Sequence, residues 1–185
     1  MGRLWVPRPS EPVSGSEQVG RRLFMPVSLK GGADQVAPLG LLQLTHFEDD
    51  LGEVSVDRLG RTAIETKVCD HIAPKCADAA RAMHKREFQG WATVAAKVLT
   101  AASQKHPEYD LEVIPSPTKD EPGKPYLLNE HHAHIVSKSG LKGYSLALHL
   151  REEFSKGKIH RLGAPAKQEL PWRRFWSWLV AKFQL

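Results

Sequence analysis

The chain carries three histidines close together, at His131, His132 and His134. Imidazole titrates near neutral pH without assistance and is the commonest metal-binding side chain in proteins. If residues 131–136 form a strand, alternation places His132 and His134 on one face and His131 on the other. The spacing therefore predicts at most a two-histidine site for metal binding or proton transfer.

Three interpretations of this pair are open. As metal ligands, His132 and His134 need a third partner to hold a catalytic zinc or iron ion, and no spacing selects one. As acid and base, they would act on a phosphodiester whose charge Arg58, Lys138 or Lys142 neutralises. As structural residues, they would hydrogen-bond to neighbouring backbone at the edge of a sheet. The pattern names no cofactor.

The two cysteines indicate a reducing compartment. Cys69 and Cys76 lie seven residues apart, which on a continuous helix separates them by roughly 10 Å along the axis, too far for a disulfide. Reduced thiols are typical of the cytosol. With His71 and His84 they offer four potential zinc ligands, but the spacing matches no standard zinc finger.

Hydropathy and charge narrow the class of protein. No uninterrupted run of about 18 apolar residues predicts a transmembrane helix, and the proline-rich first residues do not resemble a secretory signal. We therefore expect a cytoplasmic protein. Residues 131–185 hold ten Lys and Arg against three Glu, a net charge of +7, whereas the first 130 residues carry −2. This surplus suits a nucleic-acid surface, an acidic partner or a solvated charged face.

Alternation of apolar and polar residues predicts the strands that position these side chains. A strand over residues 54–58 places Val54 and Val56 toward the core and Ser55 and Asp57 on the opposite face. Other stretches that favour strands are residues 22–28, 90–100, 109–115 and 131–136. Residues 40–47 are apolar but too short to separate strand from helix.

Helical spacing predicts helices over 62–88 and 139–157, the second ended by Gly157. Pro74 inside the first predicts a bent helix or two short ones. Together the elements predict a single small α+β domain with a mostly antiparallel sheet packed against helices. Its expected parts are a flexible arm over 1–20, the domain over 21–160, and a linker with a Trp-rich helix over 161–185.

The C-terminal residues combine aromatic and basic side chains. A helix that begins at Pro171 gathers five large apolar residues into one stripe: Trp172, Phe175, Trp176, Leu179 and Phe183. Trp178 lies off the centre of this stripe, and Arg173 and Arg174 stand beside it. Clustered aromatics with arginine are typical of interface hot spots, so we expect these eight residues to bind a protein partner, with nucleic acid as an alternative. The competing interpretation is a helix that closes the domain's own core.

Several short motifs resemble a loosely defined family of small uncharacterised bacterial proteins. The motifs are Val54-Ser-Val-Asp-Arg58, Gly90-Trp-Ala92, Asn129-x-x-His132-Ala-His-Ile135 and a following helix. The resemblance covers roughly residues 21–155. It implies a small α+β fold and a site at which five residues converge: Ser55, Asp57, Arg58, Asn129 and His132. It implies no particular reaction.

Two functions follow as expectations. The first is an accessory or interaction component of a larger bacterial assembly, which docks onto protein or nucleic acid through its basic aromatic C-terminal region. Lys138 and Lys142, beside the Gly140–Gly143 pair, are candidates for contacts with phosphate. The second is a small hydrolase or nucleic-acid-processing enzyme, possibly metal-dependent, that uses His132 with Asp57 and Arg58.

Overall fold

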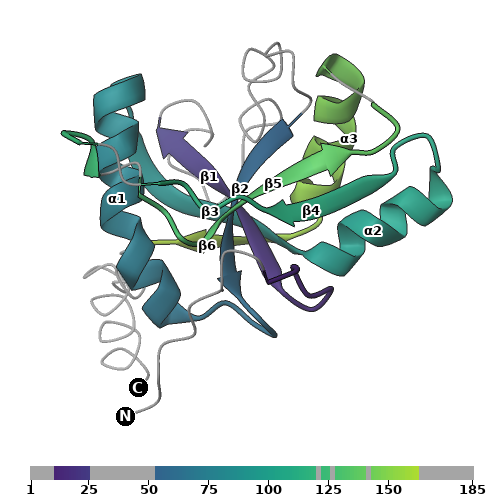
Figure 1. Cartoon of the computed structure of the whole chain (residues 1–185), viewed down its shortest axis with the longest axis horizontal. Helices are drawn as coiled ribbons and strands as arrows, with labels where there is room; N and C mark the ends of the chain where they lie inside the picture. The colour runs from purple at the N-terminus through teal and green to yellow at the C-terminus, as the bar shows by residue number, and fades with distance from the viewer. Residues whose placement is uncertain (1–10, 26–52, 120–121, 126–127, 141–142, 163–185) are drawn as a thin grey trace, which may run out of the picture.

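The structure is a computed structural model and describes residues 11–25, 53–119, 122–125, 128–140 and 143–162. Within these ranges six strands form one antiparallel sheet in the order β4-β5-β2-β1-β3-β6 (Figure 1). The strands are β1 (Gln18–Met25), β2 (Glu53–Gly60), β3 (Glu87–Ala95), β4 (Leu111–Pro115), β5 (His132–Ser137) and β6 (Lys158–Arg161). The predicted α+β class is confirmed.

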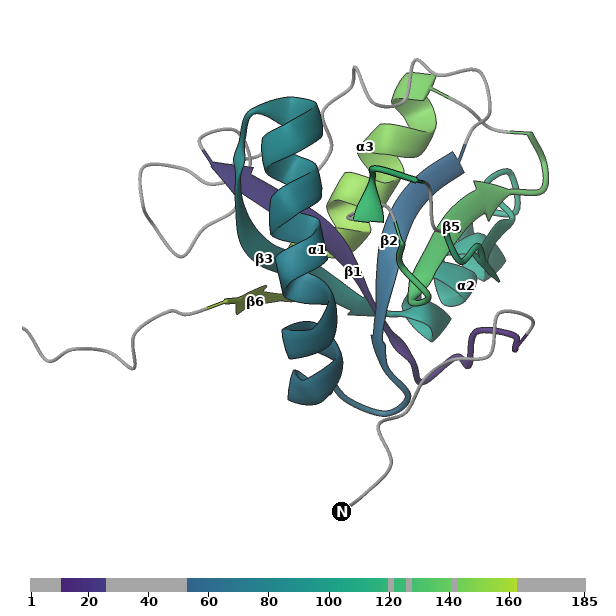
Figure 2. The ribbon, with the colours of Figure 1, turned by 60° about the vertical axis from the view of Figure 1, so that its left-hand side comes forward.

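Helices cover both faces of this sheet (Figure 2). They are α1 (Thr66–His84), α2 (Ala96–Lys105) and α3 (Gly143–Ser155). One core joins α2 and α3 to the sheet through Leu99, Leu150 and Phe154, and a second joins α1 to the other face through Ile72 and its neighbours. The sheet is therefore the middle layer of a three-layer domain.

Strand alternation decides which side chains face which core. Val54 and Val56 are 1% and 2% exposed and lie in the core with α2 and α3, as the sequence predicted. Ser55 is exposed, whereas Asp57 is fully buried on the face that α1 covers. The sequence predicted the face of Asp57 but not its burial.

α1 runs without a break from Thr66 to His84 and contains Pro74. Of the two expected outcomes, a bent helix or two short helices, the second does not occur. Proline removes one backbone hydrogen bond from a helix, but Pro74 is exposed while Ile72 and Cys76 are buried against the sheet. The interruption therefore falls on the solvent side, where water can satisfy the freed carbonyl group.

The stretch over 90–100 was expected to be a strand, and only its first half is one. β3 ends at Ala95 and α2 begins at Ala96. Ala96, Leu99 and Ala102 are the buried residues of this helix, and their spacing of three lets one helical face pack on the sheet. Alanine's helix propensity thus prevails once this face has a core to join.

Both ends of the expected domain differ from the prediction. β1 begins at Gln18, inside the stretch expected as a flexible arm, and β6 pairs with β3 as an edge strand that the sequence did not predict. The stretch 40–47 and the C-terminal residues 163–185 lie outside the described residues. Within the described ranges, no helix is long and apolar enough to span a membrane.

Candidate functional site

Polar side chains from five parts of the chain meet on the face of the sheet that α1 covers. Arg22 donates two hydrogen bonds to the buried carboxylate of Asp57, from Nε to Oδ2 and from Nη2 to Oδ1, both 2.8 Å long. Trp91 Nε1 donates to Oδ2 and Asn129 Nδ2 donates to Oδ1, each at 2.7 Å. The thiol of Cys76 lies 3.8 Å from Oδ2. We call these five residues the Asp57 cluster.

The sheet order explains why these residues meet. Trp91 lies on β3 and Asp57 on β2, with β1 between them. The indole must therefore cross β1 to reach the carboxylate, and it does so at Gly20, which pairs with Asp57 in register. A Cβ on Gly20 would lie 2.9 Å from Trp91 Cβ and Cδ1 and 2.5 Å from Leu59 Cδ1. A side chain at residue 20 is thus incompatible with this crossing.

Charge and hydrogen bonding keep Asp57 ionised. Burial by itself would raise the pKa of this carboxyl, but the charge and hydrogen bonds of Arg22, followed by the Trp91 bond, outweigh it and lower the pKa to about 2. In turn, burial opposes the charge on Arg22, yet Asp57 raises the pKa of the guanidinium. The two groups form an ion pair at neutral pH in which Asp57 is fully buried and the Arg22 side chain is 27% exposed.

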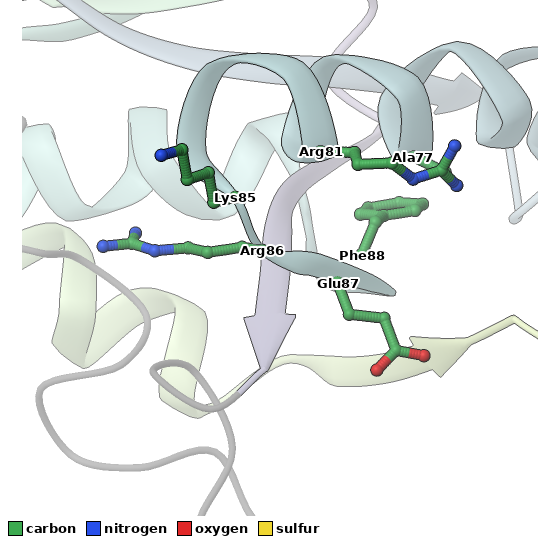
Figure 3. Close-up of a pocket in the computed structure, with 6 residues that line it drawn as sticks. All are labelled: Ala77, Arg81, Lys85, Arg86, Glu87 and Phe88. Atoms are coloured by element: carbon green, nitrogen blue, oxygen red, sulfur yellow. The ribbon is translucent and has the colours of Figure 1, made fainter.

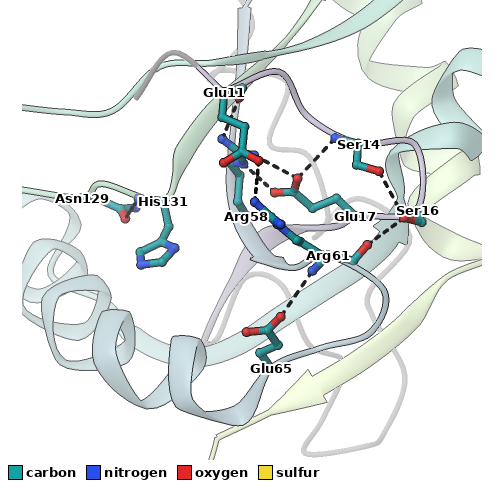
Figure 4. Close-up of polar contacts among 9 residues, drawn as sticks. All are labelled: Glu11, Ser14, Ser16, Glu17, Arg58, Arg61, Glu65, Asn129 and His131. Carbon is teal, nitrogen blue, oxygen red and sulfur yellow. Dashed lines mark hydrogen bonds and ion pairs between the residues drawn. The ribbon is translucent and has the colours of Figure 1, made fainter. Parts of the chain in front are cut away.

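Arg58, the neighbour of Asp57 on β2, belongs to a separate ion pair. It is 1% exposed and donates from Nε and Nη2 to the carboxylate of Glu17, at 2.5 and 2.9 Å (Figure 4). Its Nη1 also donates to the backbone oxygen of Glu11 at 3.2 Å. Arg61 adds a further ion pair with Glu11. These contacts tie residues 11–17, part of the expected arm, to β2.

The histidine pair lies at the exposed margin of the Asp57 cluster. In register, His132 is opposite Asp57 and His134 is opposite Ser55, so the two histidines share one face, as alternation predicted. His132 Nδ1 lies 2.7 Å from the backbone oxygen of Ser116. Because a carbonyl oxygen only accepts, Nδ1 carries the proton and Nε2 carries the lone pair.

The surroundings of the two histidines differ. Burial lowers the pKa of His132, although the charge of Asp57 and the bond to Ser116 oppose this effect. His134 is less buried and lies 2.7 Å from the carboxylate of Glu53. The rings of His132 and His134 meet edge to face, with centroids 4.7 Å apart. Within the described residues, no group of three potential metal ligands accompanies the pair.

The third histidine of the motif also lies on the α1 side of the sheet, whereas alternation predicted the face opposite to His132. His131 precedes β5, so strand alternation does not fix its direction. His131 is 1% exposed, its backbone N–H donates to Asn129 Oδ1 at 3.0 Å, and its ring is 6.0 Å from that of His71 on α1. Burial, followed by the charge of His71, lowers the pKa of His131 to about 4. His131 is therefore neutral at physiological pH.

Neither cysteine has the properties of a nucleophile. Both are buried and reduced. Burial, reinforced by the charge of Asp70, raises the pKa of Cys69 to about 11, and burial with the charge of Asp57 raises that of Cys76 well above its usual range. Thiolate chemistry requires the opposite shift.

The other candidate residues lie away from this face or outside the described ranges. Lys138 is half exposed and pairs with Glu112 at 2.9 Å. Lys142 lies outside the described residues. So do the eight C-terminal candidates for partner binding: Trp172, Arg173, Arg174, Phe175, Trp176, Trp178, Leu179 and Phe183.

Of the five residues that the resemblance brought together, three are neighbours here. Asp57 binds Asn129 directly, and His132 faces Asp57 across two paired strands. Ser55 lies farther along the face that carries Asp57, and Arg58 forms its ion pair with Glu17. Sequence reasoning missed Arg22, Trp91 and Glu17. Signals existed for two of them. An arginine inside an apolar strand, such as Arg22, indicates a buried carboxylate partner, and Trp91 lies in the Gly90-Trp-Ala92 motif.

Fold and site together define a class of protein: a small α+β domain whose sheet carries a buried Asp–Arg pair on the α1 face and two histidines beside it. No protein-family model matches the chain, and no curated protein or solved structure matches it either.

Proposed function

We propose that this chain is an accessory or interaction component of a larger bacterial assembly in the cytoplasm. In this proposal, residues 171–185 dock onto a partner, and the described domain is the scaffold that presents them. The observation that carries the proposal is the occupancy of the Asp57 carboxylate by four N–H donors.

A catalytic carboxylate needs a lone pair that faces substrate or orients the base. Asp57 is fully buried, and each of its oxygens already accepts two hydrogen bonds. Arg58 is equally buried and is held by Glu17. The most distinctive charged motif of the sequence thus supports the fold rather than a reaction, and this favours a binding protein.

The sequence of the C-terminal region suits the docking role. Its aromatic stripe offers the large rigid contact area that dominates protein interfaces, and Arg173 and Arg174 add charge that suits an acidic protein or nucleic acid. The buried reduced cysteines agree with a cytoplasmic setting. A protein partner is the first choice, because five large apolar residues recur in the sequence at helical spacing.

Co-purification from the native cells, with variants of the full chain, tests this proposal. Deletion of residues 171–185, or Trp172→Ala with Trp176→Ala, should abolish a stoichiometric partner and leave the melting temperature unchanged. Arg173→Gln with Arg174→Gln separates the two kinds of partner. Retention of the partner by the arginine variant supports a protein contact, whereas its loss together with salt sensitivity supports nucleic acid. Unfolding of the truncated chain would contradict the proposal.

A histidine-dependent hydrolase or nucleic-acid-processing enzyme is the second candidate. It is favoured by the state of His132, whose Nδ1–H is held by a backbone carbonyl while Nε2 keeps its lone pair. The same Nε2, together with His134, would serve a metal-dependent version of the site. Asp57 would act here only through its charge.

Hydrolysis of chromogenic phosphodiesters and esters tests this candidate, with and without added zinc or manganese. His132→Ala should abolish any activity, and His134→Ala should reduce it if a metal takes part. His106→Ala, at an exposed histidine, provides the matched control. Activity that survives His132→Ala, or none in the wild-type protein, would eliminate this candidate.

A further inference from the structure

A cationic hollow lies where α1 ends and β3 begins (Figure 3). Its volume is about 620 Å³. Six residues line it: Ala77, Arg81, Lys85, Arg86, Glu87 and Phe88. The lining thus holds three cations and one carboxylate, and Figure 3 shows the Glu87 side chain directed away from Lys85 and Arg86.

The basic side chains are not required to finish the helix. The backbone N–H groups of Lys85 and Arg86 both donate to the carbonyl oxygen of Ala80, so backbone groups close the last turn of α1. Lys85 adopts φ 49° and ψ 42°, the left-handed conformation in which helix ends usually carry glycine. A lysine at this position has a conformational cost, and helix capping does not explain it.

The ion pair that Arg81 makes is weak and exposed. The only ion pair of Arg81 given by the described side chains is with Asp78, at 3.5 Å, and both side chains are more than half exposed. Such a pair contributes little to stability and exchanges readily for another anion. Beneath Arg81, the Phe88 ring is buried against Trp91, with centroids 4.9 Å apart, so the floor of the hollow is fixed.

We propose that this hollow binds the phosphate backbone of nucleic acid. The cations are spread out, because Arg81 lies above Phe88 on one side while Lys85 and Arg86 extend on the other (Figure 3). An extended polyanion meets all three cations, whereas one phosphate group would meet only some of them. Phe88 is 8% exposed and cannot stack on bases. The contact is therefore electrostatic and independent of base sequence.

The inference does not rest on the proposed docking of residues 171–185. It gives the domain its own contact with nucleic acid, on residues that the sequence analysis did not select. Lysine and arginine side chains that neutralise phosphates release counterions, so the affinity should fall steeply as the salt concentration rises.

Fluorescence anisotropy of the full chain with labelled oligodeoxythymidine tests the proposal. Arg81→Gln, Lys85→Gln and Arg86→Gln combined should weaken binding at low salt by about tenfold or more and lower the slope of log K against log salt by about 2. The matched control combines Lys97→Gln, Lys105→Gln and Lys119→Gln, which remove the same charge from exposed positions elsewhere. The control variant should lose much less affinity for the oligonucleotide than the variant of the hollow.

Three outcomes would overturn the proposal. They are equal loss in the control variant, no binding by the wild-type chain at low salt, and displacement of the oligonucleotide by inorganic phosphate at matched phosphate concentration. Arg173→Gln with Arg174→Gln is measured in parallel, so that failure of the C-terminal proposal remains distinguishable. If only that variant loses binding, the hollow takes no part and its proposal fails.

Lys85→Gly separates ligand binding from folding. Glycine relieves the left-handed conformation, so the melting temperature should rise by about 2–4 °C. Affinity for the oligonucleotide should nevertheless fall, because the lysine charge is lost. A variant that is more stable and binds as tightly as the wild type would remove Lys85 from the site.

Discussion

Trp91 on β3 donates its indole N–H to Asp57 on β2, two strands away, at 2.7 Å. Cross-strand contacts in a sheet ordinarily join neighbouring strands. This one passes over β1 and therefore links three strands through a single buried hydrogen bond. The ion pair that Arg22 makes with the same carboxylate reinforces the link.

Trp91→Phe tests the value of this bond. The variant keeps an aromatic ring but removes the donor, and a hydrogen bond to a charged group contributes about 2 kcal/mol. Urea unfolding followed by circular dichroism should show a loss of that size. The pKa of Asp57, followed by carboxyl NMR, should rise above about 2. Loss of stability without a change in that pKa would indicate that only packing was removed.

Gly20→Ala should displace the Trp91 indole, because it adds a methyl group on β1, the strand that the indole crosses. The added Cβ would lie within 2.9 Å of Trp91 and within 2.5 Å of Leu59, and overpacking of this kind costs about 1–3 kcal/mol. In a Trp91→Leu background the crossing is absent, so the same substitution should cost less. Equal costs in the two backgrounds, measured by urea unfolding, would show that the glycine serves another purpose.

Periodicity carried most of what the sequence revealed about the fold. Alternation placed Val54 and Val56 in the core and grouped His132 with His134 on one face, because a period of two is fixed by strand geometry. The prediction of a strand failed at Ala96, in a stretch where alanine favours a helix and the β-branched residues favour a strand. Residues 96–105 form a helix because Leu99 and Ala102 can pack against the core, which is a tertiary effect.

The site was predicted less completely than the fold. His132 and Asp57 emerged from motifs, but their partners Arg22 and Trp91 come from strands that are distant along the chain. Sheet order decides such meetings, and local sequence does not encode it. Arg58 was assigned to the site through the resemblance, yet adjacent strand residues face opposite sides, and Arg58 pairs with Glu17 instead.

Arg22→Met should be among the most destabilising single changes in the described residues. It leaves the Asp57 carboxylate buried without its countercharge, and breaking such a pair costs about 3–5 kcal/mol. Arg81→Met, at the exposed pair with Asp78, should cost less than about 0.5 kcal/mol. Chemical denaturation of both variants measures the difference, and similar losses in the two would show that burial is not the deciding factor.

Acid should weaken the fold through Asp57 only at low pH. Its pKa is about 2 in the folded state and 3.8 in the ordinary state, so the stabilisation is complete above about pH 4 and is lost as the pH falls toward 2. The expected contribution is about 2 kcal/mol. Asp57→Asn should lose the slope of stability against pH in this window, and a slope equal to that of the wild type would show that another carboxylate is responsible.

Protonation of His131 should weaken the fold at a higher pH than protonation of Asp57. The pKa of His131 falls from 6.5 to about 4 on folding, so between these values the unfolded chain binds a proton that the folded chain does not. The free energy of unfolding should therefore decrease as the pH falls from 6.5 to 4, by up to about 3 kcal/mol. Urea titrations across this range should show a shallower slope for His131→Phe, which cannot titrate. His106→Phe, at an exposed histidine, is the control and should keep the wild-type slope. If both variants follow the wild-type curve, protonation of His131 does not limit stability in this range.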